Sequence, residues 1–111
     1  MKKDIREKWV AALRSGKYEQ GQNNLRSVDN KFCCLGVLCD IIDNTKWETF
    51  EKANSAKKTY PFTYEGFSGT ITNDLKKIAG LPNDKIGPLM NMNDEENKSF
   101  AEIADWIETN L

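Results

Sequence analysis

The longest nearly continuous apolar stretch of the chain covers residues 32–42, and polar residues surround it on both sides. It is too short to cross a bilayer, which indicates burial in a protein core. From Leu35 onward, apolar residues recur at i, i+3, i+4 and i+7, and others occupy a second face, so the pattern predicts a buried helix over residues 35–42. Gly36 lowers the helix propensity but lets another backbone segment approach closely. A buried strand is the alternative, since periodicity alone does not separate the two in a short run.

Two longer segments, one near each end of the chain, show the spacing of amphipathic helices. Residues 2–15 place their apolar side chains on one face and end before Gly16, a residue that favours a helix stop. Residues 99–110 begin with Ser99 and Glu102, which together form a capping-box pattern. We therefore predict a helix in each segment.

A shorter helix is predicted over residues 73–79, with Asn73 as its N-cap and Gly80 as its stop. The apolar residues between 86 and 92 are expected to contact the core from a short turn or a single helical turn. This part of the chain therefore adds only one short helix to the expected fold.

Short extended segments are expected between the helices. Residues 24–27 and 31–34 flank a polar turn, which permits a small hairpin. Residues 47–50 and 60–64 alternate aromatic or β-branched residues with others, as strands do, and a polar loop over residues 51–58 separates them.

Length and composition agree with one globular unit. The chain has 111 residues, of which 39% are hydrophobic and 30% charged. We expect a single α+β domain over residues 1–111, with three main helices packed on a few short antiparallel strands.

Charge and the termini limit the classes of partner. The formal net charge of −1 argues against a general nucleic-acid binder, but residues 1–31 carry a balance of +4 and the remainder −5. This asymmetry permits a local basic patch. No apolar signal core follows the N-terminus and no segment is long enough to span a membrane, so a cytoplasmic location and no membrane partner are expected. Three cysteines, two of them adjacent, favour a reduced protein over a disulfide scaffold.

The chain contains no histidine, which excludes Ser-His-Asp and Cys-His catalysis and histidine-based zinc sites. Cys33 and Cys34 precede the predicted central helix, where a helix N-terminus lowers a thiol pKa and favours a nucleophile. The alternative, favoured in the absence of a histidine base, is that cysteine acts as a small core hydrophobe. The cysteine spacing matches no structural zinc pattern, and no metal or cofactor is expected.

The polar segment after the first helix carries the strongest binding signal. Its candidate ligand-binding residues are Arg14, Lys17, Tyr18, Gln20 and Arg26. Arginine can hold a phosphate through two hydrogen bonds, tyrosine can stack on a base, and glutamine can contact a base edge. The alternative is a solvated loop whose tyrosine packs into the core.

Two further sets of residues are candidates. Asn93 and Asp94 could donate or accept hydrogen bonds to a ligand, although residues 91–97 lack the glycine and the distal glutamate of a calcium loop. Trp47 could stack on a base. The aromatic residues between 47 and 67 either form a binding surface or pack as the sheet side of the core.

Three motifs together resemble a family of small uncharacterised proteins of tailed phages and prophages. They lie in residues 9–21 (WVAALRSGKYEQG), 32–40 (FCCLGVLCD), and 92–94 continuing into 99–107 (MND and SFAEIADWI). The resemblance leaves residues 45–70 uncovered. It implies a viral origin and a host cytoplasm, and it supplies no mechanism.

In that setting, the main hypothesis is a non-enzymatic protein that binds a small anionic ligand and sequesters a nucleotide-type host defence signal. The alternative is a protein–protein inhibitor of a host factor that uses the aromatic surface of residues 47–67. A thiol-dependent enzyme built on Cys34 is the third hypothesis. The aromatic residues also leave room for a homo-oligomer.

Overall fold

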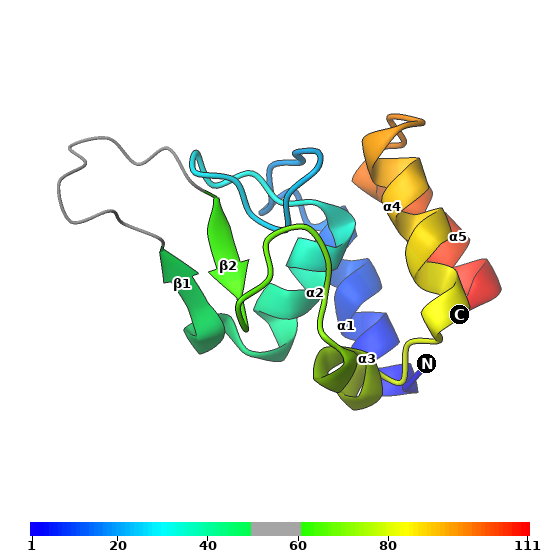
Figure 1. Cartoon of the computed structure of the whole chain (residues 1–111). Coiled ribbons are helices and arrows are strands. Elements are labelled where there is room, and N and C mark those ends of the chain that lie inside the picture. Colours follow the sequence, from blue (N-terminus) through cyan, green and yellow to red (C-terminus); the bar gives the residue numbers. More distant parts are fainter. Residues whose placement is uncertain (50–60) are drawn as a thin grey trace, which may run out of the picture.

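The computed structural model describes residues 1–49 and 61–111, which form an α+β fold (Figure 1). Within these residues there are five helices and one two-stranded antiparallel sheet. The predicted fold class is confirmed, but the number of main helices was underestimated. The elements are α1 (Lys3–Arg14), α2 (Cys34–Ile42), β1 (Trp47–Thr49), β2 (Phe62–Tyr64), α3 (Asn73–Ala79), α4 (Ile86–Asp94) and α5 (Phe100–Asn110), with short 3-10 helices at Asn44–Lys46 and Asn83–Lys85.

Helix α2 is the centre of the core, which confirms the helix and excludes the strand. Its first six residues are buried, as expected for a helix that is apolar on most sides. Helix α1 packs against it through Trp9, whose indole nitrogen donates a hydrogen bond of 2.9 Å to the carbonyl oxygen of Cys34. This bond satisfies the only polar atom of a fully buried tryptophan side chain.

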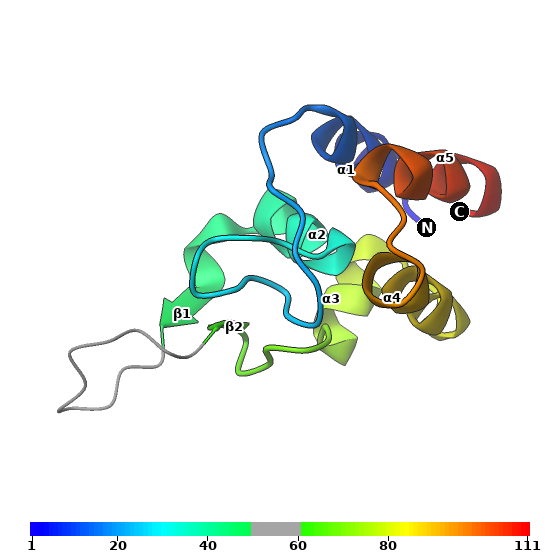
Figure 2. The same ribbon diagram turned by 90° about the horizontal axis from the view of Figure 1, so that it is seen from above.

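The two terminal helices lie side by side, so the ends of the chain are brought together (Figure 2). Helix α1 matches the predicted segment, and Gly16 follows it with φ of +75°. Helix α5 begins with the predicted capping box, in which Ser99 and Glu102 each accept a backbone amide of the other. Both sequence predictions are confirmed.

Helix α3 matches the predicted bounds, but its N-cap is Thr72 and not Asn73. Thr72 has an extended backbone and its hydroxyl accepts the amide of Leu75 at 3.2 Å, whereas Asn73 is already the first helical residue. Gly80 ends the helix in the left-handed conformation, with φ of +66°, as predicted.

Helix α4 is a correction, because a nine-residue helix replaces the expected short turn. Pro88 lies in its first turn, where backbone amides have no acceptor within the helix, so the amide that proline lacks costs the helix no hydrogen bond. Ile86, Leu89 and Met92 then recur at helical spacing and are buried. At this position proline is compatible with a helix start, so the helix continues beyond the single turn that was expected.

The sheet pairs β1 with β2 in the register Trp47 to Tyr64 and Thr49 to Phe62. The two predicted strands are confirmed over these residues, while their ends at 50 and 60 and the predicted loop 51–58 lie outside the described part of the chain. The expected hairpin near residues 24–34 is reduced to isolated bridges, since Phe32 pairs with both Gln20 and Arg26.

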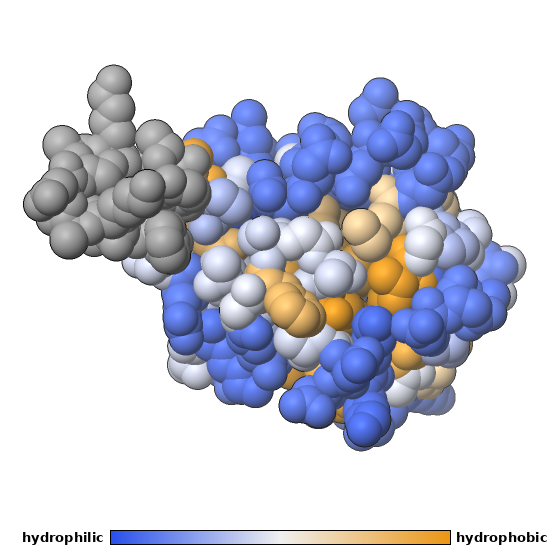
Figure 3. All heavy atoms as spheres, viewed as in Figure 1, coloured by the Kyte–Doolittle hydropathy of each residue, from blue (hydrophilic) through white to orange (hydrophobic). Residues whose placement is uncertain are grey.

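The surface seen in Figure 3 is mainly hydrophilic, with apolar side chains gathered between the segment that follows β2 and helix α4. No helix among the described residues has the length and apolar character needed to cross a membrane.

Candidate functional site

The predicted ligand-binding residues do not form one site; the structure distributes them over three places. Arg14 lies at the contact between α1 and α5. Tyr18, Arg26 and Trp47 meet beside the C-terminal half of α2. Gln20, Asn93 and Asp94 meet near the N-terminus of α2, while Lys17 is exposed on the segment between these places.

Arg14 is engaged by two carboxylates of α5. One terminal nitrogen donates to Asp105 Oδ1 at 2.6 Å, and the other donates to Glu108 Oε1. These hydrogen bonds raise the pKa of the guanidinium further above its ordinary value. Both ends of the fork are therefore used to join the terminal helices, so Arg14 does not offer the free cation that phosphate binding would need.

Asp40 organises the second group, and the sequence analysis did not select it. The Tyr18 hydroxyl donates to one carboxylate oxygen at 2.5 Å, and the Trp47 indole nitrogen donates to the other at 3.0 Å. Burial, followed by the hydrogen bond to Asp40, raises the pKa of Tyr18 to about 12. The available signal was the one carboxylate within the apolar run of residues 32–42; it lies half-buried on the surface of α2.

Arg26 lies against the aromatic side chains of this group. Its guanidinium carbon is 3.9 Å from the centroid of the Phe62 ring, and 5.2 and 5.4 Å from those of Phe32 and Trp47. Its Nε donates to Asn30 Oδ1 at 2.6 Å. Burial lowers the pKa of Arg26, while the nearby Asp40 carboxylate opposes that change. The planar cation is therefore held by cation–π contacts on ring faces.

The rings around Arg26 support one another in edge-to-face contacts. Tyr18 packs on Phe32 with centroids 5.0 Å apart, Phe32 packs on Trp47 at 5.9 Å, and Trp47 packs on Phe62 at 6.4 Å. We call these six residues the arginine–aromatic cluster: Tyr18, Arg26, Phe32, Asp40, Trp47 and Phe62.

Asn93 is the centre of the third group and is fully buried. Its amide nitrogen donates to the Gly21 carbonyl at 2.9 Å and to Asp94 Oδ1 at 2.8 Å. Its oxygen accepts from Gln20 Nε2 at 3.0 Å and from the Cys34 backbone amide at 3.2 Å. All four hydrogen-bonding positions of the amide are satisfied inside the protein. Gln20 Nε2 also donates to the Lys98 carbonyl at 2.7 Å, so Asn93 and Gln20 hold the polar segment in place and the Asn93 amide is not available to a ligand.

Sequence comparison places the protein in a family. The family described as "Domain of unknown function (DUF8296)" matches residues 1–111. The chain belongs to this family. No curated protein and no solved structure matches the chain.

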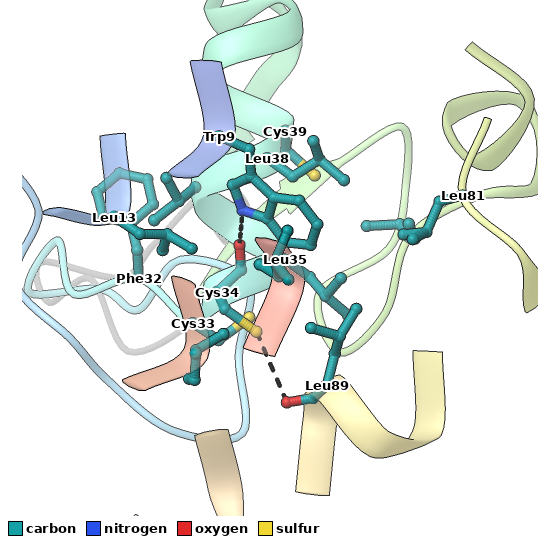
Figure 4. Packing of buried hydrophobic residues seen from close by; sticks show 14 of the residues in the cluster. Trp9, Leu13, Phe32, Cys33, Cys34, Leu35, Leu38, Cys39, Leu81 and Leu89 are labelled. Carbon is teal, nitrogen blue, oxygen red and sulfur yellow. Dashed lines mark hydrogen bonds between the residues drawn. The ribbon is translucent and has the colours of Figure 1, made fainter. Parts of the chain in front are cut away.

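The three cysteines of this family member lie in the core (Figure 4). Cys33 caps α2, its sulfur accepting the Gly36 amide at 3.4 Å, and Cys34 donates to the Leu89 carbonyl at 3.6 Å. Burial raises the pKa of Cys33 to about 11 and raises that of Cys34 well above the ordinary value. These are the properties of packed thiols and oppose those of a nucleophile.

Metal binding also lacks a built site in this part of the chain. Across residues 1–49 and 61–111, no group of three or more cysteine, aspartate or glutamate side chains is close enough to hold an ion.

The arginine–aromatic cluster is the candidate functional site, because it combines a cation, ring faces and a fixed geometry.

Proposed function

We propose that the chain is a non-enzymatic binding protein whose arginine–aromatic cluster takes a small anionic ligand with a planar group, such as a nucleotide. The observation that carries the proposal is the position of Arg26. Its guanidinium lies over the Phe62 ring at 3.9 Å, beside an indole that Asp40 fixes.

The guanidinium suits an anion because its donors lie around its edge. Of its five N–H groups, the one on Nε is directed at Asn30, and the two terminal nitrogens carry the other four. This planar fork matches the oxygens of a phosphate or carboxylate, and a ring packed on its face limits the orientations that the fork can adopt. Less rotational freedom is then lost when the anion binds.

The rings suit the planar part of such a ligand. Aromatic side chains stack on nucleobases with little dependence on the base, and Trp47 and Tyr18 are only partly buried. The ligand-contacting set is therefore narrower than the sequence suggested: Tyr18, Arg26 and Trp47, with Lys17 on the same segment.

The resemblance to tailed-phage and prophage proteins supports a biological setting for this binding. In a host cytoplasm, a protein that binds a nucleotide-type defence signal without degrading it would act as a sequestering agent. Buried thiols and the absence of histidine support binding without chemistry.

A thermal-shift and calorimetry screen tests the proposal. The panel contains mononucleotides, cyclic dinucleotides and the matching nucleosides. We expect nucleotides to raise the melting temperature and nucleosides to leave it unchanged; at a ligand concentration of a hundred Kd the gain is about 2.7 kcal/mol. Ligand recovered after denaturation should be chemically unchanged, and recovery of an altered product would instead support an enzyme.

Two arginine variants give a matched comparison. Arg26→Ala should abolish binding, and Arg26→Lys should weaken it, since lysine keeps the charge but lacks the planar fork. Arg14→Ala removes the same type of side chain at a place where two carboxylates already pair with the guanidinium, so this variant should leave the affinity for the ligand unchanged. Equal affinities for the Arg26→Ala and Arg14→Ala variants would contradict the proposed site.

A protein–protein inhibitor is the second candidate, and the composition of the same cluster favours it. Tryptophan and arginine are enriched among the residues that dominate binding energy at protein interfaces. An inhibitor should bind a defined host protein with an affinity that falls in Arg26→Ala and is insensitive to added nucleotides.

A further inference from the structure

A groove runs between the segment that follows β2 and helix α4. A depression of about 590 Å³ lies between the two, and an adjoining one of about 310 Å³ lies along α4 itself; the two depressions share Met90 and Asp94. The face shown in Figure 3 carries small, pale side chains on the segment after β2 and apolar surface between that segment and α4. The lining residues are Asn23, the 66–70 segment, Gly87, Met90, Asn91, Asp94 and Glu95.

The rim of the groove presents a large apolar side chain. Phe67 is 48% exposed, which is unusual for a ring of this size. A tight turn holds it there, because Glu65 and Gly66 both have positive φ and the backbones of Tyr64 and Phe67 exchange hydrogen bonds of 2.8 and 3.1 Å. Half-buried Met90 extends the apolar surface across the groove.

The segment after Phe67 also presents backbone. Ser68, Gly69 and Thr70 have small side chains, and a Cβ built at Gly69 meets nothing within 4 Å. Within the described residues, the one backbone hydrogen bond of these three residues joins the Ser68 carbonyl to the Leu25 amide. Residues 68–70 form bends and not a strand, so their remaining backbone groups offer individual hydrogen bonds to a chain lying in the groove.

Charge selects the kind of chain that fits. Two of the lining residues are acidic, Asp94 and Glu95, and none is basic. The Asp94 side chain is fixed, since its Oδ1 accepts hydrogen bonds from the backbone amide of Asn23 at 3.0 Å and from Asn93 Nδ2 at 2.8 Å. The groove is therefore unsuitable for the anionic ligand proposed above and complementary to a cation.

We propose that this groove binds an extended segment of a partner protein in which a basic residue lies next to an apolar one. Phe67 and Met90 contact the apolar side chain, Asp94 and Glu95 pair with the basic one, and the 68–70 backbone aligns the chain. The groove shares no lining residue with the arginine–aromatic cluster, so the two proposals can fail independently.

Fluorescence anisotropy with three labelled short peptides tests this inference. The peptides alternate leucine with lysine, leucine with glutamate, and serine with lysine. We expect the leucine–lysine peptide to bind at least about tenfold more tightly than either of the others, because each of those lacks one half of the complementarity.

Surface variants locate the binding. Glu95→Gln and Phe67→Ser should each weaken the leucine–lysine peptide about fivefold or more. Asp4→Asn and Val28→Ala are matched controls for loss of a charge and of an exposed apolar side chain, and should leave the affinity unchanged; circular dichroism verifies the fold of all four variants. Failure of the leucine–lysine peptide to bind, equal binding of the leucine–glutamate peptide, or unchanged affinity in both groove variants overturns the proposal.

Discussion

Gly36, in the first turn of α2, should not tolerate even a methyl group. A Cβ built at this position lies 1.8 Å from the carbonyl oxygen of Leu25 and 2.6 Å from its carbonyl carbon, whereas ordinary contact begins at 3.4 Å. The neighbour is backbone, so rotation of a side chain cannot relieve the overlap. The Gly36→Ala variant must therefore push residue 25 away from α2.

The cost follows from what holds Leu25 in place. Its amide donates to the Ser68 carbonyl at 2.7 Å, its carbonyl accepts from the Cys33 amide at 3.2 Å, and its side chain is fully buried. Overpacking of a tight site costs about 1 to 3 kcal/mol, and one lost hydrogen bond adds about 1 kcal/mol. Alanine returns about 1 kcal/mol of helix propensity. We expect the free energy of unfolding to fall by about 1 to 3 kcal/mol.

Urea unfolding followed by tryptophan fluorescence measures this change, since Trp9 is fully buried. Gly87→Ala is the matched control: it also lies in the first turn of a helix, and a Cβ there meets nothing within 4 Å. It should equal the parent or exceed it by up to about 1 kcal/mol. If the unfolding midpoints of the two variants agree, residue 25 does not pass as closely over α2 as described.

Three other predictions concern buried or half-buried groups. Asn93→Ala should lower the free energy of unfolding by about 3 kcal/mol, because buried donors and acceptors lose their partner; a loss under about 1 kcal/mol in urea unfolding would contradict the network. The Tyr18 hydroxyl should ionise with a pKa of about 12, above its ordinary value of 10. The stability that this neutral hydroxyl contributes is therefore complete below pH 10 and is lost as pH rises through 12. Ultraviolet titration of tyrosinate against Tyr18→Phe measures this, and a difference already complete near pH 10 would refute it. The three thiols should resist a thiol reagent in the native protein and react in urea; a fast native thiol would support the enzyme hypothesis.

The helices could be predicted from the sequence to the extent that their signals are local. Apolar spacing and the glycine after the helix set α1, and the capping box set the start of α5. The N-cap of α3 was misplaced by one residue, because threonine and asparagine are both good caps and only backbone geometry decides between them. Helix α4 was expected only as a short turn or a single helical turn, and its full nine residues were not predicted.

The candidate site was less predictable, because partners distant in the chain decide what each polar residue does. Arg14 and Gln20 had the residue types of a binding loop, but their hydrogen-bond partners Asp105 and Asn93 lie 91 and 73 positions away. Residue type alone does not distinguish an arginine that is available to bind a ligand from one whose guanidinium is paired within the protein and joins two helices. Arg26 differs because its described contacts are ring faces and one amide, which leave its terminal nitrogens for another partner.

The residues that proved structural determine how rigidly Arg26 is presented. The polar segment before Arg26 is attached at two points along α2. Tyr18 donates a hydrogen bond to Asp40 in the C-terminal half of α2. Gln20 donates to Asn93 of α4, and Asn93 also accepts the Cys34 backbone amide at the start of α2. Ordering this segment in advance removes an entropic cost from ligand binding. Loosening it at Asn93 should therefore weaken binding at the arginine–aromatic cluster without touching a ligand contact, whereas Arg14→Ala, which acts between α1 and α5, should not. The buried apolar run is in this sense part of the binding site, because it fixes the segment that carries the cation.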